Sequence, residues 1–205
     1  MRARTLIPAS LLLLTPFLTG CPQGGGGGGI KKIDQSSLVE VITSDDAKVL
    51  DPHTTSDGGN VKVIVQIYQT LVRVDPGDFK KDLRPELAES WLISDDATTI
   101  TFQIRKGVKF HDGADLDAAA CKLSLERLLE RGFKLSVSPY GFMFDDLDAI
   151  TAEGQTLTVA LKSPVAPVVL RSLSMFSASI VSPKLLEATK TMDPGAAQVH
   201  VTQNA

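Results

Sequence analysis

Cys21 is the residue of this sequence whose neighbours most clearly indicate a chemical reaction. It follows Leu18-Thr19-Gly20 and stands at the end of an apolar run that starts at Leu6. A cysteine thiolate is a nucleophile, and small residues in front of it fit the groove of a processing peptidase. The segment therefore favours cleavage before Cys21 and a covalent modification of its sulfur.

The first 20 residues have the properties of an export signal. Arg2 and Arg4 form a short positive segment, and the apolar run 6–18 has the length of a secretory signal core. A transmembrane helix would need about 20 apolar residues. The end of the run resembles a bacterial lipobox, in which the cysteine receives fatty-acyl chains such as palmitate and becomes the new N-terminus. This resemblance implies a signal peptide over residues 1–20 and a lipid anchor on Cys21; a stray cysteine behind an ordinary signal peptide is the alternative.

Residues 21–34 form a glycine-rich segment with an unbroken glycine run at 24–29. Such a run satisfies the G-x-G-x-x-G pattern of dinucleotide-binding loops, but that loop needs a strand before it and a helix after it. Here a signal segment precedes the glycines and Lys31-Lys32 follows them. We interpret residues 21–34 as a flexible tether between anchor and folded domain.

Composition and charge exclude several classes of protein. With 43% hydrophobic and 22% charged residues, the chain is close to an ordinary globular domain and unlike a disordered, collagen-like or disulfide-rich chain. The 21 basic and 24 acidic residues give a net charge of −3. The sequence therefore provides no basic surface for binding nucleic acid.

Other residue types that could bind a metal or carry out catalysis form no recognisable pattern. His53, His111 and His200 are too scattered for a metal motif, and no G-x-S-x-G nucleophile elbow is present. The acidic run 145–148 lacks the spacing of an EF-hand loop. The sequence predicts no metal, no cofactor and no catalytic residues.

Strands and helices alternate through residues 35–190, which predicts a mixed α/β class. Expected strands cover residues 38–42, 91–93, 99–104, 144–151, 156–161 and 177–181, and a turn or short helix covers 85–91. Expected helices cover residues 60–72, 118–131 and 183–189, with a further short helix starting at Val168. Asp57 or Asn60 could cap the first of these helices.

The expected helix 118–131 has the clearest pattern. Asp117 is its expected N-cap, and Gly132 is its expected stop. An apolar stripe on it comprises Cys121, Leu125, Leu128 and Leu129, so the Cys121 thiol is expected to be buried and unreactive. The charged residues are placed mostly on other faces; they are Lys122, Glu126, Arg127, Glu130 and Arg131.

Several motifs follow one another in a fixed order along the folded part. They are Leu50-Asp51-Pro52-His53, Leu83-Arg84-Pro85-Glu86-Leu87-Ala88-Glu89-Ser90-Trp91, Ser94-Asp95-Asp96, Thr101-Phe102, Arg105-Lys106-Gly107-Val108-Lys109-Phe110-His111-Asp112-Gly113 and Ser124-Leu125-Glu126-Arg127. In this order and at these spacings they resemble the N-terminal lobe of family 5 extracellular solute-binding proteins. Those proteins are the peptide, nickel and sugar receptors of bacterial ABC importers.

The resemblance implies the N-terminal lobe of a two-lobe, periplasmic-binding-protein type II-like fold, and a binding protein rather than an enzyme. The implied partners are a peptide or similar small solute, an ABC permease, and the membrane that holds the lipid anchor. The implied location is the cell envelope, facing the periplasm or the cell exterior. By the same resemblance, Ser56 and Asp57 in the loop after L-D-P face the ligand, and so does Tyr140 in Ser138-Pro139-Tyr140.

The end of the sequence departs from the family pattern. Relatives continue after the helix at 183–189 with a G-T-G-P-Y segment and a second lobe, whereas residues 191–205 form an atypical tail here. We therefore expect a truncated receptor lobe; a non-transporting surface lipoprotein or a pseudogene fragment is the alternative. A secreted hydrolase is a weaker possibility, since no motif supports it.

Overall fold

The structure, a computed structural model, describes residues 46–74, 82–133 and 138–205. The chain divides into the units 1–41 and 42–205, and every described residue belongs to the second. The signal peptide 1–20, Cys21, the tether 21–34 and the strand 38–42 lie outside the described residues. Within the described part, the expected mixed α/β class is confirmed.

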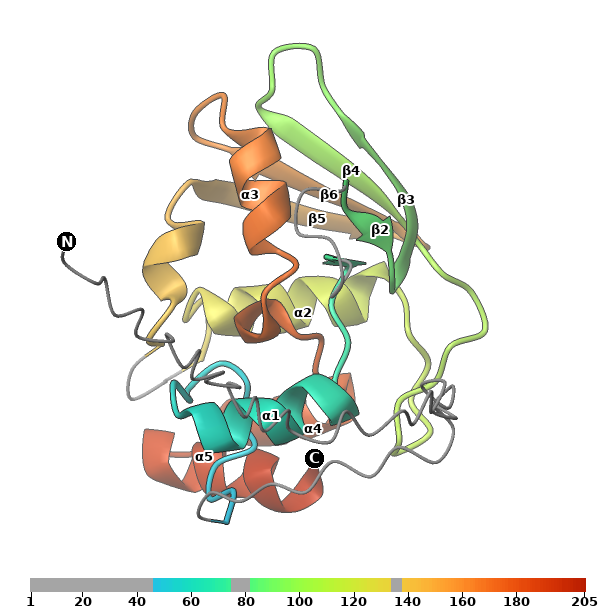
Figure 1. Ribbon diagram of the computed structural model, residues 1–205. Helices are drawn as coiled ribbons and strands as arrows, with labels where there is room; N and C mark the ends of the chain where they lie inside the picture. Colours follow the sequence, from blue (N-terminus) through green and yellow to red (C-terminus); the bar gives the residue numbers. More distant parts are fainter. Residues whose placement is uncertain (1–45, 75–81, 134–137) are drawn as a thin grey trace, which may run out of the picture. The chain divides into compact units, whose positions relative to one another are not determined.

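A four-stranded antiparallel sheet is the main sheet of the fold (Figure 1). Its strands are β3 (Ala88–Ile93), β4 (Thr99–Ile104), β5 (Leu147–Glu153) and β6 (Thr156–Leu161), in the spatial order β3-β4-β6-β5. Two hairpins thus meet through β4 and β6, where Phe102 lies opposite Leu157. Ile100, Phe102 and Ile104 are fully buried, as their alternation along the strand predicts.

The segment before the main sheet differs from expectation. Residues 85–91, expected as a turn or short helix, instead contribute to β2 (Arg84–Pro85) and β3. Their helix-forming residues are overridden because Trp91 pairs with Phe102 of β4, and tertiary pairing outweighs local propensity. β2 in turn pairs with β1 (Val72–Arg73) in a separate two-stranded sheet.

The first two helices begin at the side chains that the sequence indicates. α1 (Gly58–Ile67) is capped by Asp57, whose carboxylate accepts from the N–H groups of Gly59 and Asn60. It ends earlier than the expected residue 72, because the chain then turns into β1 and buries Leu71 there. α2 (Ala118–Leu128) is capped by Asp117. Gly132, at φ 75°, follows α2 in the left-handed conformation that glycine adopts most easily.

Helices cover one face of the main sheet. α2 packs against β5 and β6, with its stripe residues Cys121, Leu125 and Leu128 buried, and α3 (Ala166–Ser172) packs against β4 (Figure 1). This packing forms one hydrophobic core between helices and strands. In the described part of the chain, no helix has both the length and the apolar character needed to span a membrane.

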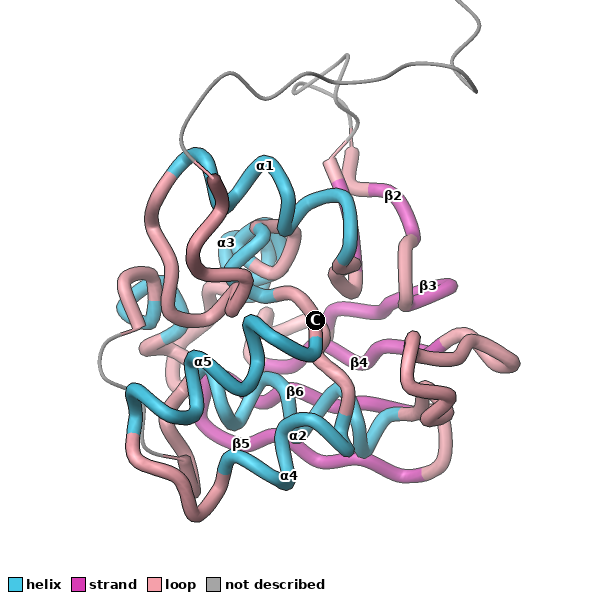
Figure 2. The backbone as a smooth tube through the Cα atoms, turned by 90° about the horizontal axis from the view of Figure 1, so that it is seen from below, coloured by secondary structure: helices cyan, strands magenta, loops and turns pink. Residues whose placement is uncertain are grey.

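The chain after α3 was predicted only in part. Residues 177–181 are buried as expected, but they form no strand: a short 3₁₀ helix, η3 (Phe176–Ala178), is followed by extended backbone. The Ile180 N–H donates to the Gln69 carbonyl rather than to a ladder. α4 (Pro183–Thr189) has the predicted bounds. Residues 194–204, part of the predicted atypical tail 191–205, form α5 (Pro194–Asn204), which packs beside α4 (Figure 2).

Candidate functional site

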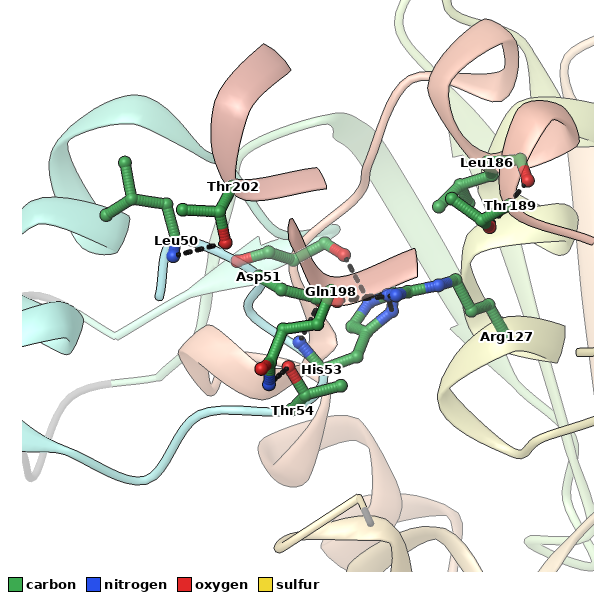
Figure 3. A network of polar contacts seen from close by, with 10 residues as sticks. Leu50, Asp51, His53, Thr54, Arg127, Leu186, Thr189, Gln198 and Thr202 are labelled. Atoms are coloured by element: carbon green, nitrogen blue, oxygen red, sulfur yellow. Dashed lines mark hydrogen bonds and ion pairs between the residues drawn. The ribbon is translucent and has the colours of Figure 1, made fainter. Parts of the chain in front are cut away.

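A buried ion pair between Asp51 and Arg127 lies at the base of the candidate site (Figure 3). Neither side chain is exposed to solvent. Arg127 Nη1 donates to Asp51 Oδ1 at 2.9 Å, and Nη2 donates to Oδ2 at 2.5 Å. A contact of this two-pronged kind is stronger and more directional than a single hydrogen bond. It joins the loop before α1 to the body of α2.

His53 extends this ion pair. Its Nδ1 atom lies 2.8 Å from Arg127 Nη1, and its Nε2 atom lies 3.1 Å from the carbonyl oxygen of Ser179. Because an arginine nitrogen can only donate, Nδ1 accepts and the ring proton sits on Nε2, which donates to Ser179. Burial, followed by the charge of Arg127, lowers the pKa of His53 to about 4, although the Asp51 charge acts in the opposite direction. The imidazole is therefore neutral at physiological pH.

Ser124 connects the same helix to the same backbone segment. Its hydroxyl donates to the Ser179 carbonyl at 3.2 Å and accepts from the Val181 N–H at 3.0 Å. Ser124 and Arg127 lie three positions apart on α2, so both face the same side of that helix. Asp51, His53, Ser124, Arg127 and the Ser179 carbonyl are hereafter called the buried network.

Helix α5 holds the loop 50–54 from its other side. The Leu50 N–H donates to Thr202 Oγ1 at 3.1 Å, and Gln198 Nε2 donates to Thr54 Oγ1 at 2.9 Å (Figure 3). The loop is thus fixed between α2 and α5, elements that occur much later in the chain. A loop held at this many points can present the residues that follow it in a defined conformation.

Ser56 and Asp57, both predicted to face a ligand, follow this loop directly and are exposed. Thr55 beneath them is buried and accepts from Asn60 Nδ2 at 2.9 Å. Asp57 Oδ1 already accepts from the N–H groups of Gly59 and Asn60 at the start of α1. Its first role is therefore that of a helix cap, which leaves Ser56 and the second carboxylate oxygen of Asp57 as polar groups for a ligand.

Tyr140, the third predicted ligand residue, is half-buried at the start of the 3₁₀ helix η2 (Gly141–Phe144). Its ring meets the Phe176 ring edge-on, with centroids 5.3 Å apart and planes at 83°. Phe176 opens η3, and η3 also packs against α1, which Asp57 caps. The structure thus places Tyr140 and helix α1 against η3, but no hydrogen bond between described residues links Tyr140 to Ser56 or Asp57.

Sequence reasoning missed the most buried part of the site. The sequence pattern groups Arg127 with the charged residues outside the apolar stripe of α2, and it does not predict that this side chain is fully buried. His53 was considered only as a possible metal ligand. Both residues stand in motifs that carry the family resemblance, and that was the available signal. Asp51 and Arg127 carry opposite charges and stand in two different motifs, which could have suggested that they form an ion pair.

Cys121 and His111 are two further side chains whose types could take part in catalysis or metal binding. Burial raises the pKa of the Cys121 thiol, so it stays protonated and inert, as expected. His111 is exposed in its turn. Among the described residues, no group of three or more His, Cys, Asp or Glu side chains is arranged to hold a metal ion.

Breaking the buried ion pair should strongly destabilise the fold. We expect Arg127→Met to lower the free energy of unfolding by about 3–5 kcal/mol, because Asp51 would remain charged and buried without its partner. The double variant Asp51→Leu/Arg127→Met should regain much of this loss. Urea unfolding of the three proteins measures both effects, with Arg171→Met on the exposed end of α3 as the control. Single and double losses that simply add would contradict the coupling.

The stability of the fold should also fall as the pH is lowered from about 6.5 to about 4, the ordinary and native pKa values of His53. In this window the unfolded chain takes up a proton at His53 that the folded chain does not. The contribution is fully present above the ordinary value and its loss amounts to roughly 3 kcal/mol at the acid end. Unfolding curves measured across this pH range should show a shallower dependence for His53→Gln, whereas His111→Gln should behave like the parent protein.

Comparison with known proteins places the chain in a family. The family model described as bacterial extracellular solute-binding proteins, family 5 Middle, matches residues 82–199, which include the main sheet, α2 and the first half of α5. The probable D,D-dipeptide-binding periplasmic protein DdpA of Escherichia coli is 35% identical over 144 residues, which are 69% of this chain and 27% of DdpA. The glutathione-binding protein GsiB of Salmonella paratyphi A is 32% identical over 151 residues, 73% of this chain and 28% of GsiB.

Solved structures give the same assignment. The periplasmic binding protein DppA of Helicobacter pylori, in complex with the peptide STSA, superposes with a TM-score of 0.58 at 28% identity, covering 70% of this chain and 30% of DppA. The chain therefore spans less than a third of the length of these relatives. The mixed α/β fold described above is part of the fold of type II periplasmic binding proteins. The chain belongs to the bacterial extracellular solute-binding proteins of family 5, a family of binding proteins rather than enzymes, and corresponds to the N-terminal portion of its members.

Proposed function

We propose that this chain is the N-terminal lobe of a substrate-binding component that captures peptides or related small solutes for a bacterial ABC importer. The observation that carries this proposal is the buried network, which fixes the loop before Ser56 and Asp57 against the segment that continues from Phe176. The family resemblance expects ligand contacts at Ser56 and Asp57, which follow this loop, and at Tyr140, whose ring meets that of Phe176. The named solutes of the relatives, a D,D-dipeptide, glutathione and a tetrapeptide, belong to the same chemical class.

The exposed groups at this site suit an extended peptide. Ser56 offers a hydroxyl, and the half-buried ring of Tyr140, held edge-on by Phe176, offers an apolar wall with a polar tip. Backbone hydrogen bonds supply affinity for extended peptides, and side-chain pockets set specificity. A second lobe would close over the ligand, and the closed form would then meet the permease.

We further propose that the mature protein is attached to the envelope membrane through acyl chains on Cys21. Each buried CH₂ group of an acyl chain contributes about 0.8 kcal/mol, so several chains hold a protein at a membrane surface. The glycine run 24–29 would then give the folded lobe freedom to approach a permease.

Peptide binding should require more than residues 1–205, because this chain spans only about 28% of a full receptor such as GsiB. We expect calorimetry to detect no binding of glutathione or a dipeptide to the isolated chain. A chimera in which residues 46–205 replace the matching part of GsiB should bind such a ligand, and Tyr140→Ala in the chimera should weaken binding about tenfold or more. Phe142→Ala, which removes an exposed ring nearby, is the control. Micromolar binding to the isolated chain would contradict the two-lobe requirement, and an unchanged affinity of the Tyr140→Ala chimera would remove Tyr140 from the site.

Lipid attachment is tested separately. After expression in a bacterium that processes lipoproteins, the intact mass should correspond to a chain that starts at Cys21 and carries acyl groups, and detergent should be needed to extract it. Cys21→Ser should remain unprocessed and unmodified. A free thiol on Cys21 in the mature protein would refute the anchor.

A further inference from the structure

A groove lined by two arginines lies apart from the predicted ligand residues. It has a volume of about 260 Å³, and its lining includes Arg73, Arg105, Glu86, Gln69, Leu87 and Val108. A second hollow of about 110 Å³ shares Gln69, Leu87 and Val108 with it and continues over further apolar side chains such as Phe110 and Leu185. The two hollows thus share one wall, and together they are here called the arginine groove. One end carries the two arginines, and the other is lined mainly by apolar side chains, with Lys109, His111 and Asp112 also present.

The positions of both arginines are set by the fold. Arg73 ends β1, and Arg105 directly follows β4. The Arg105 backbone N–H donates to the Leu87 carbonyl at 2.9 Å, and its Nε donates to the Glu86 carbonyl at 3.1 Å. Arg105 is therefore fastened to the segment between β2 and β3 by main chain and side chain. Among the described residues, its two Nη atoms make no hydrogen bond, so they are free to donate to a ligand.

The charge of the groove is not balanced by its own acid. Glu86 Oε2 accepts from the Thr70 N–H at 2.8 Å and from Thr70 Oγ1 at 2.7 Å. The Glu86 carboxylate therefore points toward Thr70, just before β1, and is already hydrogen-bonded there. Within the described part of the chain, neither Arg73 nor Arg105 forms an ion pair. Two guanidinium groups beside one engaged carboxylate leave a net positive end to the groove.

We propose that the arginine groove binds a small organic carboxylate whose apolar body lies along Leu87 and Val108. A guanidinium group matches a carboxylate with two parallel N–H donors, which a point charge such as lysine does not. The apolar walls shared by the two hollows then cover the body of the ligand. The lining of this site does not include Ser56, Asp57 or Tyr140.

The test is a titration of the full chain with hexanoate in which ligand-observed NMR measures binding. We expect saturable binding that is weakened about tenfold or more in Arg73→Gln and in Arg105→Gln, since each removes charge-assisted hydrogen bonds. Arg171→Gln, which removes an exposed arginine on α3, should leave the affinity unchanged. Hexanol, with the same apolar body and no charge, should bind at least tenfold more weakly than hexanoate.

Each outcome decides between alternatives. Equal affinities for hexanoate and hexanol would overturn the role of the arginines, and the absence of saturable binding would overturn the site. The hexanol comparison uses the unmodified chain, so it stands even if an arginine variant fails to fold. Tyr140→Ala should not affect hexanoate binding, so failure of this proposal and failure of the proposed peptide site can be told apart.

Discussion

The fold depends on a fully desolvated ion pair between Asp51 and Arg127. Removing two charges from water is costly, and the attraction between them offsets this cost only when the geometry is good and the remaining polar atoms are satisfied. Here the carboxylate receives both Nη groups, and His53 accepts a further N–H from Nη1. Arg127 Nε has no hydrogen-bond partner among the described residues, so not every polar atom of the pair is satisfied. Replacing such a pair by apolar residues is often neutral for stability, whereas removing one partner alone is costly.

That arrangement gives the site its rigidity. The loop 50–54, helix α2 and the segment before α4 are fixed at one point by the buried network. Ser56 and Asp57, the exposed residues proposed to contact a ligand, follow that loop directly. Ser56 comes soon after His53, and Phe176 comes shortly before Ser179. The charged groups of the network are themselves inaccessible to a ligand. The residues that hold the loop are thus different from the exposed residues proposed to contact a solute.

Much of this fold follows from sequence patterns. The alternation in β4, the caps Asp57 and Asp117 and the bounds of α4 are local properties, and they were predicted. Segments whose conformation depends on distant partners were not: residues 88–91 join a strand because β4 lies beside them, and residues 177–181 remain outside any ladder. The burial of Arg127 belongs to the second group. A charged side chain is expected to be exposed to solvent unless a partner of opposite charge lies beside it. That Asp51 lies beside Arg127 is visible only in the folded chain.

The loop 50–54 also has a consequence for the order in which the structure can assemble. Its hydrogen bonds reach Arg127 across 76 positions, Ser179 across 126 and Thr202 across 152. Closing long chain segments costs entropy before any contact is gained, so such contacts form late. During synthesis from the N-terminus, the loop can therefore complete its contacts, those to Gln198 and Thr202 included, only after α5 has been made. The loop, together with the exposed Ser56 and Asp57 that follow it, is then among the last segments of the described chain to become native.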